Sequence, residues 1–595
     1  MQTVSQEWKN NQKQTLVSES DIEVSIKLTD PDAYEDGSAT DNGHLAFSDT
    51  NHIVSDGEKN IRPYATLERN QWLLDGSREI LPTSNYGETG FIDDGLSSGD
   101  RTFSSHPIVS INFTKVHTNL LQGVTITWSV FLNEYAEEFI ITAYNGSTVV
   151  ASKTVTNNTS VKTTVLMDIV NYNKITIEIV KWSLAYRHAR IDEVFIGVNT
   201  IFSKNDIFSY SCSYESDPIS AELPKAEVSF SLNNVAKIFN PYNTEGISKY
   251  LVERQEISVK YGYKLESGVK WINGGKFYLS EWDAKQGGIG ADFTARDLLE
   301  FMTDTYYKGL YNPNGTSLYD LAEDVLLDAD LPVNADGSVK WVIDNALKNV
   351  YTKSPLPIDS HANCLQLIAN AGCCVLYQDR TGVLHLEQRL TISTDTDYEI
   401  SLFNSYSKSD LSLSKPLKQV NVPCYSYSVA TQSSELYKGV MNINGTVEVM
   451  ITYSGQASNV SATLSGGTLN SATYYTNSCV LNITANGDVT ITIKGYALES
   501  SSVLISTTSG VTGETITVDN SLITSQERAV AIGTWVESYM KNRMTLSSQW
   551  RADPRLDALD VVDNENDYGV NKVLMTNVKY SYNGAFRGSG EGRVV

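Results

Sequence analysis

The sequence predicts a mainly β protein with some α-helix (α+β), built from several domains. Its 595 residues are several times the usual length of one domain. The chain holds 33 Tyr against 16 Phe, and many short segments alternate apolar and polar residues. Alternation with a period of two is typical of strands that bury one face, and a Tyr-rich composition favours β-sheets.

The segment 256–302 carries the clearest pattern. Two strands are expected on either side of an Asn-Gly-Gly turn at 273–275. In each strand, alternate residues are expected on one face. They are Ile257, Val259 and Tyr261 in the first strand and Phe277, Leu279 and Glu281 in the second. A third strand follows at 291–296, and the spacing of Leu298, Leu299 and Met302 then predicts a short helix.

Residues 1–60 predict a short helical lead and one strand at 22–28. An isolated strand is unstable, so this strand is expected to pair with strands beyond residue 202. Between them, strand patterns recur at 108–113, 124–130, 138–144, 148–155, 161–166, 174–181 and 190–196. Short strands with polar turns such as Asn145-Gly146 favour an antiparallel jelly-roll sandwich over 61–201, inserted at a loop.

Beyond residue 202, strands are expected at 208–214 and 226–232. Helical spacing predicts helices at 317–328 and 361–374, the second followed by a strand, an Asp-Arg-Thr-Gly turn at 379–382 and a return strand. Ser/Thr/Gly-rich strands between 439 and 504, with a hairpin turn at 486–488, predict a small immunoglobulin-like insertion. A capping box at 524–527 predicts another helix, and strands close the chain.

Three sets of residues resemble one family. They are Gly-Gly-Lys-Phe-Tyr-Leu-Ser-Glu-Trp at 274–282 with Thr-Ala-Arg-Asp-Leu-Leu at 294–299, Asp-Pro-Arg-Leu-Asp-Ala-Leu-Asp-Val-Val at 553–562, and Tyr-Asn-Gly-Ala-Phe-Arg-Gly at 582–588. This order resembles the hub protein at the distal end of tails in bacteriophages of Gram-positive bacteria. The stretch 65–77 resembles sandwich insertions of the same tail proteins, which are similar to galactose-binding carbohydrate modules.

The resemblance covers residues 1–60, 202–430 and 521–595 and implies a division of the chain. The implied parts are a first hub β-barrel domain from 1–60 and 202–305, an inserted jelly-roll, carbohydrate-binding-like sandwich at 61–201, a second α+β hub domain at 306–430, an inserted immunoglobulin-like domain at 431–520, and a helix with closing strands of the last hub domain at 521–595.

The resemblance also implies a structural role. Three copies would form a homotrimer, in which two similar β-barrel domains per chain give a pseudo-sixfold ring matching the hexameric tail tube. This hub would join tube to tip and gate the lumen for DNA ejection. Implied partners are the tail tube, distal tail and baseplate proteins, the tape measure protein, receptor-binding or tip proteins, and host cell-wall glycan. The implied location is the virion, at the tail tip or baseplate, after synthesis in the host bacterial cytoplasm.

The formal net charge is −24. An acidic surface repels phosphate, so DNA is expected to pass without specific binding, although acidity equally keeps a protein soluble. The N-terminus is polar, so no secretory signal is predicted. The sequence contains no run of 18 apolar residues, so no membrane span is predicted.

No enzymatic or metal-binding motif is found. The chain has no His-Glu-x-x-His, no Gly-x-Ser-x-Gly and no phosphate-binding glycine loop, and its seven His are scattered. We therefore expect no enzyme activity, no catalytic residue, no metal and no cofactor. Oxygen ligands for Ca²⁺ could come from Asp93-Asp94 or from Asp557, Asp560 and Asp563, but solvated turns are the preferred interpretation. The six Cys lack metal-ligand spacing, and Cys373-Cys374 is expected to be buried and reduced.

Carbohydrate binding by the sandwich has five candidate residues: Trp72, Tyr86, Tyr186, Arg187 and His188. Aromatic rings stack on the C–H faces of sugars, and Arg can fix hydroxyl groups. Trp128 and Trp182 lie within alternating strands and are expected in the core. The alternative function is therefore a carbohydrate-binding adhesin that contacts the host surface through 61–201. A hydrolase with an unrecognised site ranks third.

Overall fold

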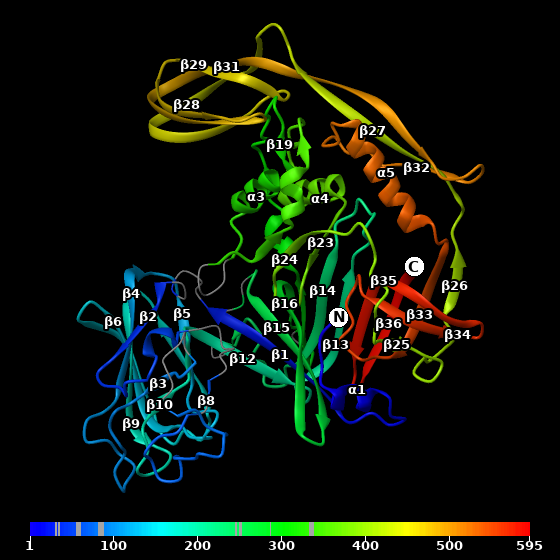
Figure 1. Ribbon diagram of the computed structural model, residues 1–595. Coiled ribbons are helices and arrows are strands. Elements are labelled where there is room, and N and C mark those ends of the chain that lie inside the picture. The colour runs from blue at the N-terminus through cyan, green and yellow to red at the C-terminus, as the bar shows by residue number, and fades with distance from the viewer. Residues whose placement is uncertain are drawn as a thin grey trace.

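In the computed structural model the chain is mainly β, with several sheets and few helices, and the predicted fold class is confirmed (Figure 1). The structure describes residues 1–29, 33, 36–54, 61–62, 64–80, 88–243, 247–248, 251, 253–285, 287–332 and 338–595. Within these ranges, no helix is long and apolar enough to cross a membrane.

One large sheet forms the centre of the molecule. Over the described residues its 13 strands run in the order β12-β1-β15-β16-β17-β14-β13-β35-β36-β33-β26, with β34 beside β35 and β25 beside β34. The bounds are β1 (Ser20–Thr29), β12 (Gly197–Ser203), β13 (Ile207–Glu215), β14 (Lys225–Asn233), β15 (Glu256–Leu265), β16 (Gly268–Asp283), β17 (Gly290–Arg296), β25 (Glu399–Ile400), β26 (Asp410–Leu413), β33 (Met544–Arg551), β34 (Val561–Asn566), β35 (Gly569–Tyr582) and β36 (Phe586–Val594).

This sheet joins two strand sets. We call β1 and β12–β17 the N-terminal strand set, and β25, β26 and β33–β36 the C-terminal strand set. They meet where β13 pairs antiparallel with β35, from Tyr210 opposite Tyr582 to Glu215 opposite Asn577. The predicted first strand, β1, pairs with β12 and β15, so its later partners are present.

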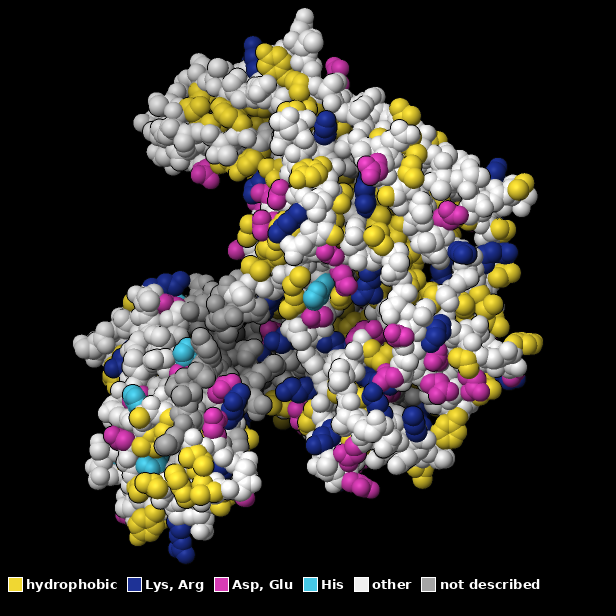
Figure 2. All heavy atoms as spheres, in the orientation of Figure 1, with side chains coloured by type: hydrophobic (Ala, Val, Ile, Leu, Met, Phe, Trp, Pro, Cys, Tyr) yellow, Lys and Arg dark blue, Asp and Glu magenta, His cyan; other side chains and the backbone are white. Residues whose placement is uncertain are grey.

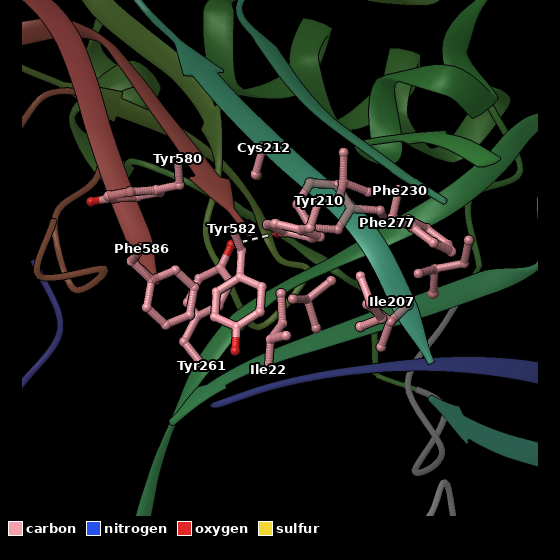
Figure 3. Close-up of a cluster of buried hydrophobic side chains, with 14 of the residues drawn as sticks. Ile22, Ile207, Tyr210, Cys212, Phe230, Tyr261, Phe277, Tyr580, Tyr582 and Phe586 are labelled. Atoms are coloured by element: carbon pink, nitrogen blue, oxygen red, sulfur yellow. Dashed lines mark hydrogen bonds between the residues drawn. The ribbon is translucent and has the colours of Figure 1, made fainter. Parts of the chain in front are cut away.

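Alternate side chains of both strand sets share one apolar core. Ile257, Val259 and Tyr261 are fully buried, as their alternation predicts. In Figure 3 the rings of Tyr210 and Tyr261 lie among side chains of β35 and β36. The Tyr210 and Tyr261 hydroxyls are 2.6 Å apart, and the Tyr261 ring lies edge-on to Phe586, with centroids 5.1 Å apart. The core therefore fixes the two sets against each other.

The Asn-Gly-Gly segment at 273–275 does not form the predicted turn. β16 runs through it, and the β15–β16 turn lies at 266–267. Gly274 is instead the extra residue of a β-bulge. A Cβ on Gly274 would lie 2.8 Å from Val259 Cγ1, and the Gly274 carbonyl accepts a 2.7 Å hydrogen bond from Tyr214. Glycine is needed here because the Val259 side chain and the Tyr214 hydroxyl approach the backbone closely.

A second bulge corrects the assignment of Glu281. The register shifts between Leu279 and Glu281, so Glu281 does not share the buried face of Phe277 and Leu279. Trp282 packs against the core instead.

The segment between β1 and β12 forms two packed sheets with a separate core, at the lower left of Figure 1. One sheet has the order β2-β4-β9-β6-β7, the other β11-β5-β8, and β3 pairs with β10. The bounds are β2 (Ser38–Asp41), η1 (Thr50–His52), β3 (Phe91–Ile92), β4 (Ile108–His117), β5 (Leu121–Thr127), β6 (Ala136–Asn145), β7 (Thr148–Val155), β8 (Lys162–Ile169), β9 (Tyr172–Trp182), β10 (Arg190–Ile191) and β11 (Glu193–Phe195). We call this segment the sandwich.

The sandwich leaves and re-enters the large sheet between two adjacent strands, because Thr29 of β1 lies opposite Gly197 of β12. β2, which precedes residue 61, pairs with β4 of the sandwich. Trp128 and Trp182 are fully buried, as predicted. The β6–β7 turn is Gly146-Ser147, because Asn145 still pairs with Thr148 as the last residue of β6. The domain limits and the jelly-roll assignment stay predictions.

After β17 the chain forms a small α/β unit with its own core. The bounds are η3 (Leu298–Met302), β18 (Thr305–Tyr306), β19 (Thr316–Ser317), α3 (Leu318–Asp328), β20 (Trp341–Ile343), η4 (Asn345–Asn349), β21 (Tyr351–Thr352), β22 (Asp359–Ser360), α4 (His361–Gly372), β23 (Cys374–Gln378) and β24 (Leu384–Gln388). Both predicted helices are confirmed, and the Ser317 and Ser360 hydroxyls cap their first turns. Cys373 and Cys374 are buried and free, as predicted.

Residues 417–517 form a long arm that arches over the α/β unit (Figure 1). The bounds are β27 (Leu417–Val429), β28 (Ser434–Thr452), β29 (Ala457–Ser465), β30 (Thr468–Tyr474), β31 (Ser478–Thr508) and β32 (Glu514–Thr517). The predicted hairpin turn at 486–488 is wrong, because β31 runs through it and continues to pair with β28. Gly445 and Gly487, with φ of 92° and 142°, lie near each other on the paired strands, so both strands change direction there without breaking the ladder.

Two further helices lie near the chain ends. The helical lead is α1 (Gln6–Gln12), whose Trp8 is buried edge-on to Tyr263 at 4.9 Å. The predicted C-terminal helix is α5 (Gln526–Met540). Its cap is Ser525 rather than Thr524, because the Ser525 hydroxyl accepts the N–H of Arg528.

Candidate functional site

The structure separates the five predicted carbohydrate-binding residues. Trp72 and Tyr186 are 44% and 62% exposed, so their rings are available to a ligand. Arg187 and His188 are largely buried. Tyr86 lies outside the described residues. Of the described candidates, Trp72 and Tyr186 are therefore the two whose rings could contact a sugar directly. Carbohydrate binding itself stays a prediction.

Arg187 and His188 belong to a network of buried charges in the sandwich. The Arg190 guanidinium binds both carboxylate oxygens of Glu68, one of them at 3.1 Å, and the His188 N–H donates to Glu68 at 2.8 Å. Arg187 lies 3.2 Å from the Glu134 carboxylate and donates to the Arg69 carbonyl at 2.6 Å. These contacts hold the loop 64–80 against the end of β10 and leave Arg187 little freedom to bind a ligand.

The electrostatics of this network follow from its pairing. Burial raises the pKa of Glu68, but the hydrogen bond and charge of Arg190 outweigh it and lower that pKa to about 2. Burial also lowers the pKa of His188, which therefore favours the neutral imidazole. Sequence reasoning missed Glu68 and Arg190. The Arg-His-Ala-Arg run at 187–190 was a usable signal, because two arginines so close together need nearby carboxylates when buried.

A second buried polar cluster, centred on Arg380, lies where the strand sets meet the α/β unit. Arg380, in the β23–β24 turn, is almost fully buried. Its guanidinium donates to the Asp557 carboxylate at 2.6 Å and to the carbonyls of Asn273, Pro554 and Leu556 at 2.6–3.0 Å. The Asp-Arg-Thr-Gly turn is thus bound to the Asp-Pro-Arg-Leu-Asp segment and to the bulge of β16.

Sequence reasoning identified both of these segments as motifs but missed their contact. A hollow of about 440 Å³ lies beside Arg380, lined among others by Tyr214, Asp297 and Arg389. Burial raises the pKa of Asp297 to about 7. Its two oxygens accept N–H groups from Ala226 and Leu299, so this carboxyl holds backbone rather than a ligand.

The acidic residues considered for Ca²⁺ do not gather into a ligand set. Asp557 binds Arg380, Asp560 accepts the amino group of Met1 at 2.6 Å, and Asp563 lies 2.9 Å from Lys572. Burial and the neighbouring Asp94 raise the pKa of Asp93 to about 7. In the described part of the chain, no group of three or more His, Cys, Asp and Glu side chains is arranged for a metal ion.

No family model matches the chain, and no curated protein matches it. Among solved structures it is similar to the tail protein from Neisseria meningitidis MC58, at 8% identity over 67% of this chain and 93% of that one, with a TM-score of 0.37. It is also similar to prophage tail protein gp18 from Listeria monocytogenes EGD-e, at 10% identity over 67% and 91%, with a TM-score of 0.36. The family 32 CBM from C. perfringens NanJ, in complex with galactose, matches 30% of this chain and 99% of its own at 15% identity, with a TM-score of 0.18. TM-scores this low do not indicate the function of this chain.

Proposed function

We propose that this chain is a structural protein of a phage or phage-derived tail, namely the trimeric hub that joins the tail tube to the tip. In this role it gates the lumen for DNA ejection and has no enzymatic activity. Its partners are the tail tube, distal tail and baseplate proteins, the tape measure protein and the tip proteins. Arg380 connects the Asp-Arg-Thr-Gly turn of the α/β unit to the Asp-Pro-Arg-Leu-Asp segment and to β16 of the sheet, a buried connection of the kind that a mechanical joint requires.

The observation that carries this proposal is the joining of two strand sets in one sheet. Each chain supplies an N-terminal and a C-terminal set, connected through β13 and β35. Three copies arranged around an axis would therefore supply six sets, which matches a sixfold tube. The sandwich and the arm leave the sheet and lie at its periphery in Figure 1, so neither interrupts such a ring.

The edge strand β26 offers a surface for a second copy. Leu411 lies opposite Leu546 of β33, so both side chains share the face that carries the core. Leu546 is buried, but Leu411 is 47% exposed and Leu413 is 65% exposed. An unpaired edge with exposed apolar residues is a template for pairing with another chain. We therefore place the contact between copies at β26.

Replacing Leu411 and Leu413 with Lys should dissociate the assembly. Charged side chains on an edge strand oppose pairing with another strand, whereas they leave the exposed positions of a monomer nearly undisturbed. Light scattering should give three times the chain mass for the unmodified protein and one chain mass for the double variant. Val511→Lys, at a 92% exposed position in the arm, is the matched control and should remain trimeric. A double variant that stays trimeric would exclude β26 as the contact.

The distribution of charge bears on the expectation that DNA passes the protein without specific binding. In Figure 2 acidic and basic side chains are interspersed over the face shown. A hollow of about 720 Å³ on the polar side of the sheet is lined by small residues such as Ser211 and Ser589 and by Glu227, Lys579 and Arg587. Because this wall carries both signs of charge, we propose that DNA passes it without specific binding.

Glycan contact by the sandwich is the second candidate function, supported by the exposed rings of Trp72 and Tyr186. A glycan array with the full-length protein tests it, and Trp72→Ala with Tyr186→Ala should reduce any signal. Binding of glycans by a chain that never self-associates would favour the adhesin over the hub.

A further inference from the structure

Among the partly or fully buried arginines in the described part of the sandwich, Arg78 forms no ion pair with a carboxylate. Arg187 and Arg190 each face a buried glutamate, Glu134 and Glu68. Arg78 belongs to the same group of arginines but forms no ion pair with any described residue. Its Nε is buried and has no hydrogen-bond acceptor among the residues that the structure describes. A buried donor without an acceptor is costly, so this guanidinium is poised to bind one.

Arg78 lies at the mouth of a small pocket. Its guanidinium stacks on Phe131, 4.8 Å from the ring centre, and the Phe131 side chain is 48% exposed. The pocket is lined by Tyr64, Ser129 and Arg190 in addition to this pair, and its volume is about 20 Å³. This space admits an oxygen-bearing group of a ligand but not a sugar ring, so the rest of the ligand must lie outside, over Phe131.

Electrostatics around the pocket favour an anion. Burial and the charge of Arg190 lower the pKa of Arg78, whereas the charges of Asp75 and Glu68 oppose that shift in part. The carboxyl that lines the pocket, Asp192, accepts the N–H of Val130 at 2.9 Å, and burial raises its pKa to about 7. Asp192 is therefore only partly ionised near neutral pH and neutralises the charge of Arg78 only in part.

We infer that Arg78 and Phe131 form a subsite for an oxyanion, a carboxylate or phosphate group carried by a saccharide. The planar guanidinium of Arg can donate to two oxygens of a carboxylate or a phosphate at once. The Phe131 ring keeps the guanidinium in place and offers an apolar surface to the attached sugar. This inference rests on glycan contact by the sandwich, and it adds that the recognised glycan is acidic.

Calorimetric titration of the full-length protein with three probes tests the subsite. Glucuronate carries a carboxylate, glucose 1-phosphate carries a phosphate, and galactose is neutral. We expect one or both acidic probes to bind, and Arg78→Met to weaken that binding about tenfold or more, because a charge-assisted hydrogen bond is lost while the packing on Phe131 is kept. Arg69→Met changes an exposed arginine of the same loop and should alter affinity by less than about twofold.

The outcomes separate the two claims. Acidic probes that bind the unmodified protein and Arg78→Met equally would overturn the subsite. Galactose binding without any preference for the acidic probes would overturn it as well, but would leave glycan contact standing. The absence of binding by all three probes would overturn both, whereas the trimer is measured independently. Hydrogen exchange in β4, β6 and β9 should be the same in both variants, which excludes unfolding as the cause of lost binding.

Discussion

Arg380→Met should destabilise the central body by about 3–5 kcal/mol, the usual cost of removing one partner of a buried ion pair. The change leaves Asp557 without its cation and the carbonyls of Asn273, Pro554 and Leu556 without a donor. Arg380→Lys should recover only part of the loss, because one ammonium cannot reach four acceptors arranged for a planar guanidinium.

Hydrogen exchange read by segment is the measurement for Arg380→Met. We expect faster exchange in β16, β23, β24 and β35 and unchanged exchange in the sandwich, which has a separate core. Arg296→Met is the matched control, because its ion pair with Glu227 is exposed and should contribute less than about 1 kcal/mol. Equal effects of the two substitutions would contradict the role of Arg380 as the joint.

Glu68→Gln should affect the opposite part of the molecule from Arg380→Met. We expect it to destabilise the sandwich by about 3–5 kcal/mol and to leave the stability of the large sheet unchanged. The substitution removes the negative charge that neutralises the buried Arg190. Glu88→Gln changes an exposed ion pair with Arg62 in the same region and should have little effect.

The same pair predicts a dependence of stability on pH. The pKa of Glu68 falls from its ordinary value of 4.5 to about 2 in the folded state. Its contribution is therefore fully present above about pH 4.5 and is lost as the pH falls toward 2. The difference in stability between the unmodified protein and Glu68→Gln should shrink over this window. A difference that stays constant from pH 6 to pH 2 would show that the carboxylate is not the source of the stability.

Much of the fold follows from local pattern. Alternation predicted the buried faces of Ile257, Val259 and Tyr261, and helical spacing predicted α3, α4 and α5, because each pattern reports the burial of one face. The Asn-Gly segments were less informative. At 145–146 the asparagine ends a strand and the glycine begins a turn, but 273–275 and 486–487 lie inside long strands, where glycine permits a bulge or a bend. An Asn-Gly segment at a turn and one inside a strand differ only in whether the neighbouring strand continues to pair past it.

The candidate sites were predicted less well, because they depend on contacts between distant segments. Trp72 and Tyr186 are exposed, as a ligand-binding role requires, whereas Arg187 and His188 are held by Glu134 and Glu68. The Arg380 joint connects residues 273, 380 and 557, whose proximity no local pattern encodes. Arg78 became a candidate only when its lack of a partner could be compared with the pairing of Arg187 and Arg190.

The central claim is that three copies form a ring from six strand sets. Single-particle electron microscopy of the purified full-length protein tests it most directly. We expect threefold particles with a continuous inner wall, the sandwich and arm projecting from its outside. Single chains at the highest concentration that the protein tolerates, or particles with twofold symmetry, would contradict the hub.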